Sequence, residues 1–109
     1  MERLGIPVIC VISNDSGWGM ISLAEEMIRP EEVAARGHAN VKLADRRAYE
    51  RIATMWDGHA EMVTDPDEIL PAIRRAAANG KPSIVNVIVD NESKTGSIAG
   101  YASFVRASV

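Results

Sequence analysis

Two stretches of the chain are apolar at nearly every position instead of alternating between apolar and polar. They are residues 6–12 and residues 84–89, both rich in isoleucine and valine. Runs of this kind are typical of strands that a parallel sheet buries on both faces. Pro7 is compatible with this assignment because proline is tolerated where a strand begins. A brief extended piece at 60–63 predicts a third strand.

Short helices are predicted after the first strand. We expect one from about Ile21 to Ile28, after the cluster of turn-forming residues at 13–19. Pro30 either breaks this helix or opens a second one, with two glutamates in its first turn. Residues 37–40 are expected to form a loop.

Two further helices have clearer boundaries. The first is expected to begin at an Asp45 cap and to end at residues 57–58. Its apolar face is Tyr49, Ile52, Ala53 and Trp56. The second is expected to begin at residues 65–68, with Asp65 as N-cap, Pro66 at the first helical position and Glu68 closing a capping box. Its predicted buried stripe is Ile69, Leu70, Ile73, Ala76 and Ala77, and Gly80 and Pro82 are expected to stop it.

This order of elements predicts an α/β fold with a parallel sheet and right-handed crossovers. Three strands make a small sheet, and two of them are apolar on both faces, so further partners should cover them. The chain also begins almost inside its first strand. We therefore expect residues 1–90 to be part of a doubly wound sheet cut from a larger protein. Residues 91–109 are expected to be a tail that folds over a site as a lid or is disordered.

Composition narrows the classes of function. With 47% hydrophobic and 25% charged residues, the 109-residue chain has the composition of one small soluble domain. Its formal net charge of −3 argues against a nucleic-acid partner, which needs a basic surface. No apolar stretch approaches the roughly 20 residues that cross a bilayer, so no membrane partner is expected. Cys10 is the only cysteine, which excludes an intrachain disulfide and fits a reducing cytoplasm.

The turn after the first strand, residues 13–21, is the best place to look for a site. Ligands of open α/β sheets bind beyond the carboxyl ends of the strands. Asn14 offers a side-chain oxygen to Mg²⁺, and the glycines let a backbone carbonyl turn toward the ion. The helix that follows presents free N–H groups to a phosphate. The same residues are also typical of an ordinary turn, so on these grounds both interpretations stay open.

Three segments together resemble one enzyme family. Residues 5–21, Gly-Ile-Pro-Val-Ile-Cys-Val-Ile-Ser-Asn-Asp-Ser-Gly-Trp-Gly-Met-Ile, resemble the second half of the thiamine-diphosphate motif, a hydrophobic strand ending in Asn-Asn or a close variant. Ala44, Asp45 and Tyr49, then residues 58–69 and residues 80–90, also resemble this family, so the likeness extends to about Asp90. It is closest to the acetolactate synthase-like group, which includes oxalyl-CoA decarboxylase and benzoylformate decarboxylase and in which Asn-Asp-x-x-Trp-Gly recurs.

The resemblance implies the C-terminal half of a thiamine-diphosphate-binding fold. Asn14 matches the asparagine whose side chain ligates Mg²⁺, and Ser16 matches the position whose backbone carbonyl is also a ligand. The residues implied to bind the cofactor are Asn14, Asp15, Ser16, Gly17, Trp18, Gly19 and Met20. Ser13 replaces the family's first asparagine, a departure that occurs within this subgroup. No residue of the chain is assigned a catalytic role.

Two parts of the family's machinery would lie elsewhere. The Gly-Asp-Gly triplet, which supplies the acidic Mg²⁺ ligand, would precede Met1, and the glutamate that activates the cofactor belongs to an N-terminal domain. The resemblance therefore implies a fragment of a thiamine-diphosphate- and Mg²⁺-dependent decarboxylase or carboligase that acts on 2-keto acids or acyl-CoA. We expect it to be inactive alone and to need the missing domains or a partner chain, in a homo-oligomer.

Two alternatives remain beside this interpretation. In the first, the chain is a non-catalytic α/β module that binds a partner through its sheet edge. In the second, it is one chain of a split enzyme. A flavodoxin-like receiver or nucleotide-binding domain is a weaker third, because it needs a phosphate loop or an acidic pocket after the first strand and the sequence has neither.

The other reactive side chains are expected to be structural. His38 and His59 lie in loop-like stretches without a carboxylate at useful spacing, and Cys10 is expected to be an inert core thiol. Trp56 is expected to pack in the core, whereas Trp18 stands between two glycines and either lines the cofactor cleft or does not. Charged residues expected on solvated helix faces or in first turns are Glu25, Glu26, Glu31, Glu32, Arg46, Arg47 and Arg51.

Overall fold

A computed structural model describes residues 2–90, so the predicted tail at 91–109 lies outside the described residues. Within them the chain forms two compact units, a sheet unit (2–16 and 44–89) and a helical unit (17–43). The elements are the 3-10 helices η1 (Glu2–Leu4), η2 (Tyr49–Trp56) and η3 (Pro66–Glu68), the strands β1 (Ile9–Asn14), β2 (Ala60–Val63) and β3 (Ser83–Ile88), and the α-helices α1 (Gly19–Ile28), α2 (Pro30–Arg36) and α3 (Ile69–Asn79).

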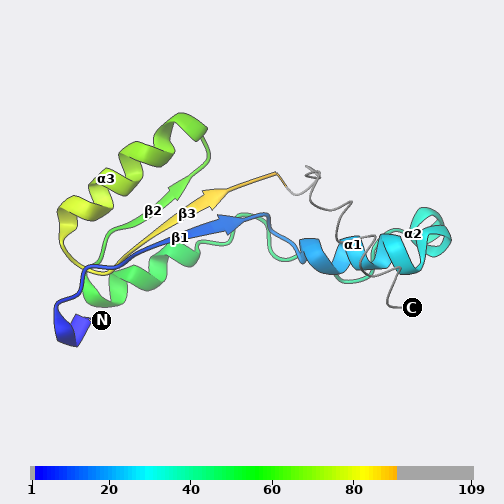
Figure 1. Cartoon of the computed structure of the whole chain (residues 1–109), viewed down its shortest axis with the longest axis horizontal. Coiled ribbons are helices and arrows are strands. Elements are labelled where there is room, and N and C mark those ends of the chain that lie inside the picture. The colour runs from blue at the N-terminus through cyan, green and yellow to red at the C-terminus, as the bar shows by residue number, and fades with distance from the viewer. Residues whose placement is uncertain (1, 91–109) are drawn as a thin grey trace. The chain divides into compact units, whose positions relative to one another are not determined.

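The three strands form an entirely parallel sheet in the order β1-β3-β2 (Figure 1). The register pairs Asn14 of β1 with Ile88 of β3, and Val63 of β2 with Val87 of β3. The central strand is therefore the last strand of the described residues, which places both its neighbours beside one long apolar run. This arrangement confirms the predicted α/β fold with a parallel sheet and flanking helices.

Strand β1 begins and ends later than the apolar run predicts. The Val8 N–H donates to the Ile6 carbonyl at 3.0 Å, so the residues around Pro7 form a tight turn before the strand. At the other end the pairing with β3 continues through Ser13 and Asn14. The strand thus extends into the polar residues that the sequence indicates as a turn, and it places Asn14 in the sheet itself.

One face of the sheet carries the hydrophobic core. Its buried members come from β2, β3 and α3 and are Val63, Ala72, Ala76, Val85 and Val87. Figure 1 shows α3 on one side of the strands and η2 on the other, and both contact β3. Because side chains alternate along a strand, Val85 points toward α3 while Asn86 points toward η2. The face of the sheet that carries the polar side chain of Asn86 is therefore the one that η2 covers.

Helix α3 ends where the sequence predicts, but it begins at Ile69 and not at the predicted first position, Pro66, because the 3-10 helix η3 forms the first turn. The Asp65 carboxylate accepts a hydrogen bond from the Asp67 N–H at 3.0 Å, and Pro66 occupies the first position of η3, which leads into α3. Gly80 ends the helix in the left-handed region, with φ of 69°. These signals act over only a few residues, which is why the sequence reveals them.

The predicted buried stripe of α3 is wrong at two positions. Leu70 is 55% exposed and Ala77 is exposed, whereas Ala72, absent from the predicted stripe, is fully buried. The helix turns Ala72 and Ala76, four residues apart, toward the sheet. Two alanines on this face let the helix approach the sheet closely.

The segment after residue 48 is a 3-10 helix, not the predicted α-helix capped by Asp45. Its N-cap is Ala48, which makes no side-chain capping hydrogen bond. With three residues per turn, positions three apart share a face, so Ala53 is buried and Ile52 is 50% exposed. The predicted end is confirmed, because Asp57 closes the helix with a left-handed φ of 55°.

The helical unit contains α1 and α2. Helix α1 begins at Gly19, two residues before the predicted start. Pro30 opens α2 as its first residue, with Glu31 and Glu32 in the first turn, so the second of the two sequence alternatives is confirmed. Among residues 2–90, no helix is long and apolar enough to cross a membrane.

Strand β1 is an edge of the sheet with apolar side chains open to solvent. Val11 is 49% exposed, and Cys10 is exposed as well. The prediction that Cys10 is a core thiol is therefore wrong, because among residues 2–90 only β3 pairs with β1. An apolar parallel strand with one free edge is a surface on which another strand can pair.

Candidate functional site

The side chain of Asn14 is held at the carboxyl end of β1. It is 6% exposed, and its amide makes a hydrogen bond at each end. The Oδ1 atom accepts from the Ser16 N–H at 3.0 Å, and the Nδ2 atom donates to the Arg47 carbonyl at 3.4 Å. The Asn14 carbonyl in turn accepts from the Val89 N–H at 3.0 Å. The predicted metal ligand is thus fixed at the strand end where α/β sheets bind ligands.

The backbone bends at Ser16, which has a left-handed φ of 55°. A non-glycine residue rarely adopts this conformation, and such residues concentrate at functional sites. The Ser16 hydroxyl accepts a hydrogen bond from the Arg46 N–H at 3.0 Å, which ties the turn to the segment before η2. Asp15 lies between the two predicted metal contacts and is half-buried.

The remaining predicted cofactor residues belong to the helical unit. Gly17 forms an isolated antiparallel bridge with Lys42, and Trp18 is the N-cap residue of α1. The Trp18 N–H donates to the Val41 carbonyl at 2.8 Å, while its side chain is 55% exposed. Gly19 and Met20 are the first residues of α1. The structure therefore brings Asn14, Asp15 and Ser16 together within the sheet unit and places Gly17, Trp18, Gly19 and Met20 in the other unit.

A buried polar network beside Asn14 is absent from the predicted site. Asn86, in the middle of β3, is fully buried and donates from Nδ2 to the Arg47 carbonyl at 2.9 Å and to Glu50 Oε2 at 2.8 Å. Glu50 is itself 7% exposed. The sequence carries one signal of this network, because Asn86 is the polar residue inside an otherwise apolar strand. Its partners lie 36 and 39 residues away, which no local pattern reveals.

The oxygen atoms at the end of β1 suit a hard cation. The Asn14 amide oxygen, the Asp15 carboxylate and the Ser16 carbonyl are the kinds of ligand that Mg²⁺ prefers. A single hydrogen bond to Asn14 Oδ1 leaves that oxygen a second lone pair. Within the described part of the chain, no three His, Cys, Asp or Glu side chains gather to hold a metal ion. These residues therefore fit part of an octahedral shell and leave the rest to other ligands.

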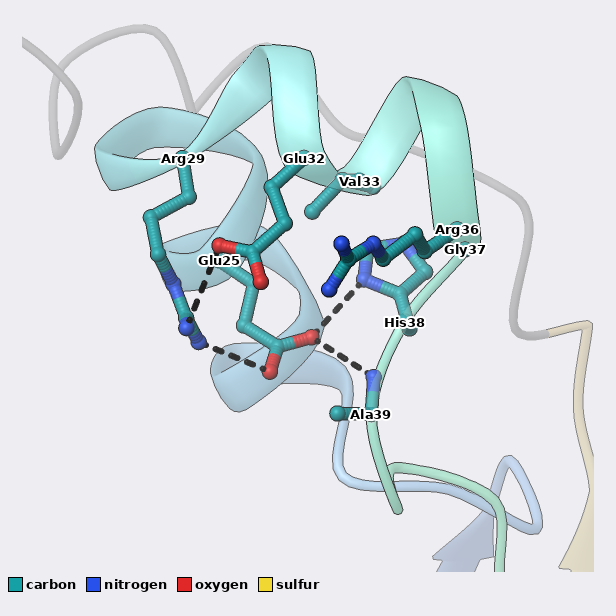
Figure 2. A pocket seen from close by; sticks show the side chains of 8 residues that line it. All are labelled: Glu25, Arg29, Glu32, Val33, Arg36, Gly37, His38 and Ala39. Atoms are coloured by element: carbon teal, nitrogen blue, oxygen red, sulfur yellow. Dashed lines mark hydrogen bonds and ion pairs between the residues drawn. The ribbon is translucent and has the colours of Figure 1, made fainter.

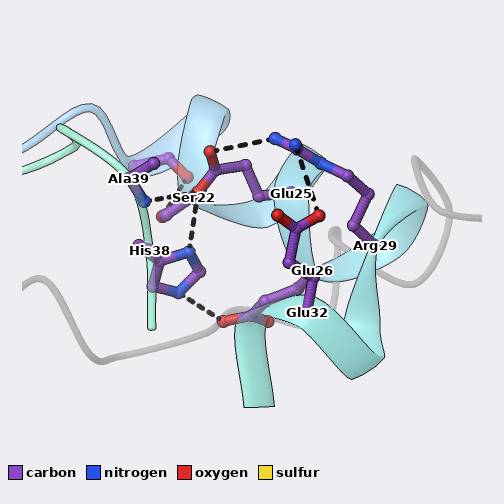
Figure 3. Close-up of polar contacts among 8 residues, drawn as sticks. Ser22, Glu25, Glu26, Arg29, Glu32, His38 and Ala39 are labelled. Carbon is purple, nitrogen blue, oxygen red and sulfur yellow. Dashed lines mark hydrogen bonds and ion pairs between the residues drawn. The ribbon is translucent and has the colours of Figure 1, made fainter. Parts of the chain in front are cut away.

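A second polar cluster lies in the helical unit, around His38. Figure 3 shows its ring between two carboxylates, with Nδ1 3.2 Å from Glu25 Oε2 and Nε2 3.2 Å from Glu26 Oε1. Glu25 also accepts from the Ala39 N–H at 3.2 Å and pairs with Arg29 at 3.4 Å. The expectation that His38 lacks a carboxylate partner is wrong, because the loop after α2 returns to α1.

A shallow hollow of about 240 Å³ adjoins this cluster (Figure 2). Side chains of α1, α2 and the loop at 37–39 line it, and Arg29 pairs there with both Glu25 and Glu32. Its lining thus mixes acidic and basic groups that largely satisfy each other. This arrangement fastens α2 and its loop to α1 and does not select a ligand of either charge.

The second histidine also has a carboxylate partner. His59 Nε2 lies 2.6 Å from Glu61 Oε2, and Arg75 donates to both oxygens of Glu61. The Arg75 guanidinium, with a smaller contribution from His59, holds the pKa of Glu61 below its ordinary value, and the carboxylates beside Arg75 raise the pKa of that guanidinium. Glu68 bonds to Arg75 at 3.1 Å instead of closing the predicted capping box. This network joins β2 to α3 and is structural.

Comparison with known proteins places the chain in a family. The sequence pattern of the family described as "Thiamine pyrophosphate enzyme, C-terminal TPP binding domain" matches residues 1–87. The chain is 33% identical over 90 residues to the "Probable acetolactate synthase" of Mycobacterium bovis and to the "Acetolactate synthase large subunit IlvG" of Mycobacterium tuberculosis.

Each of these alignments covers 83% of this chain and 15% of the relative, so the chain spans about 15% of the length of the proteins it matches. No solved structure matches the chain. The family match covers both β1 with its turn and nearly all of β3. The chain therefore belongs to the thiamine pyrophosphate enzyme family, in which it represents the C-terminal, cofactor-binding domain.

Proposed function

We propose that this chain contributes part of the magnesium–diphosphate site of a thiamine-diphosphate-dependent decarboxylase or carboligase. The observation that carries the proposal is the fixed Asn14 amide at the carboxyl end of β1, in a chain whose residues 1–87 match the family. Relatives named as acetolactate synthases support a 2-keto acid substrate, and acyl-CoA is the other class we consider.

In this proposal Asn14 and Ser16 hold the metal. The Asn14 Oδ1 atom supplies a side-chain ligand, and the Ser16 carbonyl supplies a backbone ligand from the left-handed turn. Asn14, Asp15, Ser16, Gly17, Trp18, Gly19 and Met20 contact the cofactor, as the resemblance implies. When bound, thiamine diphosphate acts as the electron sink for cleavage or formation of a carbon–carbon bond. The role of this chain is to anchor and orient the diphosphate and not to move a proton.

The residues that the structure describes provide too few ligands to complete such a site alone. Mg²⁺ needs six oxygen ligands in near-ideal octahedral geometry, and phosphates, water and at least one further protein carboxylate have to supply the remainder. Cys10 and Val11 are exposed at the open edge of β1. This exposure supports a further strand that pairs with β1 and supplies the missing carboxylate. We propose that N-terminal domains or a partner chain complete the enzyme, as a cytoplasmic homo-oligomer that is inactive when reduced to this chain.

The same exposed edge supports the alternative function. A non-catalytic module, or one chain of a split enzyme, would also use β1 to bind its partner. The two proposals differ in what Asn14 does, because a simple binding module does not require a particular amide at the end of the strand.

A chimaera tests the proposal. The matched 90-residue segment of the Mycobacterium tuberculosis protein is replaced by the corresponding residues of this chain, and Mg²⁺-dependent binding of thiamine diphosphate is measured by calorimetry. We expect the chimaera to bind the cofactor and to consume pyruvate. Asn14→Ala should weaken the affinity for thiamine diphosphate in the presence of Mg²⁺ by at least about a hundredfold. Circular dichroism checks that each variant is folded.

Asn79→Ala is the matched control, because Asn79 is an exposed amide at the end of α3. It should leave both cofactor affinity and pyruvate consumption unchanged. A folded Asn14→Ala chimaera with unchanged Mg²⁺ dependence would contradict the role of Asn14. Turnover of pyruvate or oxalyl-CoA by the 109-residue chain alone would contradict the proposal that the chain is incomplete.

A further inference from the structure

Asn14 and Asn86 share one face of the sheet. The register pairs Asn14 with Ile88, and Asn86 with Ile12, two residues earlier on each strand. Because side chains alternate with a period of two, both asparagines point to the face that η2 covers. Two buried amides from neighbouring strands therefore meet the segment that leads into η2.

The Arg47 carbonyl is the acceptor that these two amides share. Asn86 Nδ2 donates to it at 2.9 Å and Asn14 Nδ2 at 3.4 Å, and a carbonyl oxygen can accept both bonds. The other N–H of Asn86 is taken by Glu50 Oε2 at 2.8 Å. Asn86 thus links η2, through Glu50, to the backbone oxygen that Asn14 contacts.

This arrangement determines which way the Asn14 amide faces. With Oδ1 toward the Ser16 N–H and Nδ2 toward the Arg47 carbonyl, both ends make a hydrogen bond. A half-turn of the amide would set donor against donor at Ser16 and acceptor against acceptor at Arg47. Only one orientation satisfies both, and it keeps the oxygen on the side of the turn.

A buried asparagine in a central strand is costly unless its polar atoms are bonded. Asn86 is fully buried, and its Oδ1 atom has no hydrogen-bond partner in the described structure. An apolar residue would avoid that cost but could not donate hydrogen bonds. The two bonds that the Asn86 Nδ2 atom donates are therefore what this residue contributes. We infer that Asn86 and Glu50 are positioning residues, which hold the Arg47 carbonyl so that Asn14 presents its oxygen to the cation. This inference rests on the proposed role of Asn14.

Side-chain amide exchange in the full chain tests the positioning without any metal. In protein labelled with ¹⁵N-asparagine, Asn86→Asp removes the donor with almost no change of shape, and Glu50→Leu removes the acceptor. We expect both to speed exchange of the Asn14 Nδ2 protons about fivefold or more. Glu50→Gln keeps an acceptor oxygen and should retain most of the protection, as should Asn79→Asp at an exposed amide. Unchanged exchange in Asn86→Asp and Glu50→Leu, or equal losses in Glu50→Gln and Glu50→Leu, would overturn the inference.

The Mg²⁺ dependence of thiamine diphosphate binding by the chimaera tests the functional consequence. We expect Asn86→Asp and Glu50→Leu to raise the Mg²⁺ concentration at half-saturation about tenfold, beyond any change in unfolding midpoint. A merely structural role would lower the midpoint and leave that concentration unchanged in the folded protein, which would refute the inference. Asn14→Ala distinguishes failure of the proposed function from failure of this inference. If Asn14→Ala leaves the Mg²⁺ dependence unchanged, Asn14 does not bind the metal, whatever the exchange data show.

Discussion

The Trp56 indole N–H donates a hydrogen bond to the Pro82 carbonyl at 2.5 Å, which ties the end of η2 to the loop before β3. The two residues are 26 positions apart in the sequence. Gly58 lies beside this bond, because a Cβ at that position would meet both the Pro82 oxygen and the indole nitrogen. A side chain at that position would have to occupy the volume of the bond itself.

Replacing Gly58 with alanine should therefore be strongly destabilising. A Cβ at Gly58 would overlap the Pro82 carbonyl oxygen and lie 2.7 Å from the Trp56 indole nitrogen. We expect Gly58→Ala to lower the free energy of unfolding by about 3 kcal/mol, measured by urea denaturation. Gly80→Ala is the control, because its φ of +69° is strained but nothing lies within 4 Å of its Cβ, and it should cost only about 1 kcal/mol. A smaller effect at Gly58 than at Gly80 would contradict the packing described.

The ion pair of Glu61 with Arg75 should make stability depend on acid pH. Arg75 lowers the pKa of Glu61 in the folded state. The stability that this ion pair contributes is therefore present above the pKa of a glutamate in the unfolded chain, about 4.3, and is lost as the pH falls through the lower folded-state pKa. Wild-type protein should thus be more stable than Glu61→Gln at pH 6, and the difference should be smaller at about pH 3. Urea unfolding at the two pH values measures it, and an equal difference at both would exclude the linkage.

Val11, at the exposed edge of β1, should be important for assembly of the chimaera and not for the stability of the free chain. Val11 is 49% exposed, so Val11→Lys should change the unfolding free energy of the free chain by no more than about 0.5 kcal/mol. In the chimaera a strand should cover this position, and the buried charge should prevent assembly, which size-exclusion chromatography detects. Val85→Ala, at a fully buried position, should instead cost about 2 kcal/mol in the free chain. Normal assembly of the Val11→Lys chimaera would contradict the missing strand.

Features set by neighbouring residues could be predicted from the sequence. The Asp65 cap, the Gly80 stop, the two apolar strands and the turn at Asn14 each depend on a few adjacent positions. The parallel sheet followed from the same patterns, because strands without polar alternation need cover on both faces.

Features set by distant contacts could not be predicted. Asn86 is bonded to residues 36 and 39 positions away, and its identity as a site residue depends on those partners. The sequence predicts a buried Ile52 because its pattern suits 3.6 residues per turn, whereas the observed 3-10 geometry turns this side chain outward. The exposure of Cys10 follows from strand order, which no local pattern contains.

Glu25 should stabilise the loop after α2 through three partners at once. Its carboxylate bonds to Arg29, to the His38 ring and to the Ala39 N–H, and its side chain is 12% exposed (Figures 2 and 3). Glu25→Gln keeps the shape but removes the charge that strengthens each bond. We expect hydrogen exchange of the Ala39 amide to rise about five- to tenfold, since a hydrogen bond to a charged group is worth about 1.5 kcal/mol or more.

Glu31→Gln is the matched control for this prediction, because Glu31 lies exposed in the first turn of α2. It removes the same charge from α2, the helix that leads into the loop, yet it should leave Ala39 exchange unchanged. A general effect of net charge on the helical unit would accelerate exchange equally in both variants, and equal acceleration would therefore show that Glu25 does not act through its contacts. A selective effect of Glu25→Gln assigns the order of residues 38–39 to that carboxylate, because the backbone N–H of Ala39 has its acceptor on α1 and not within its own loop.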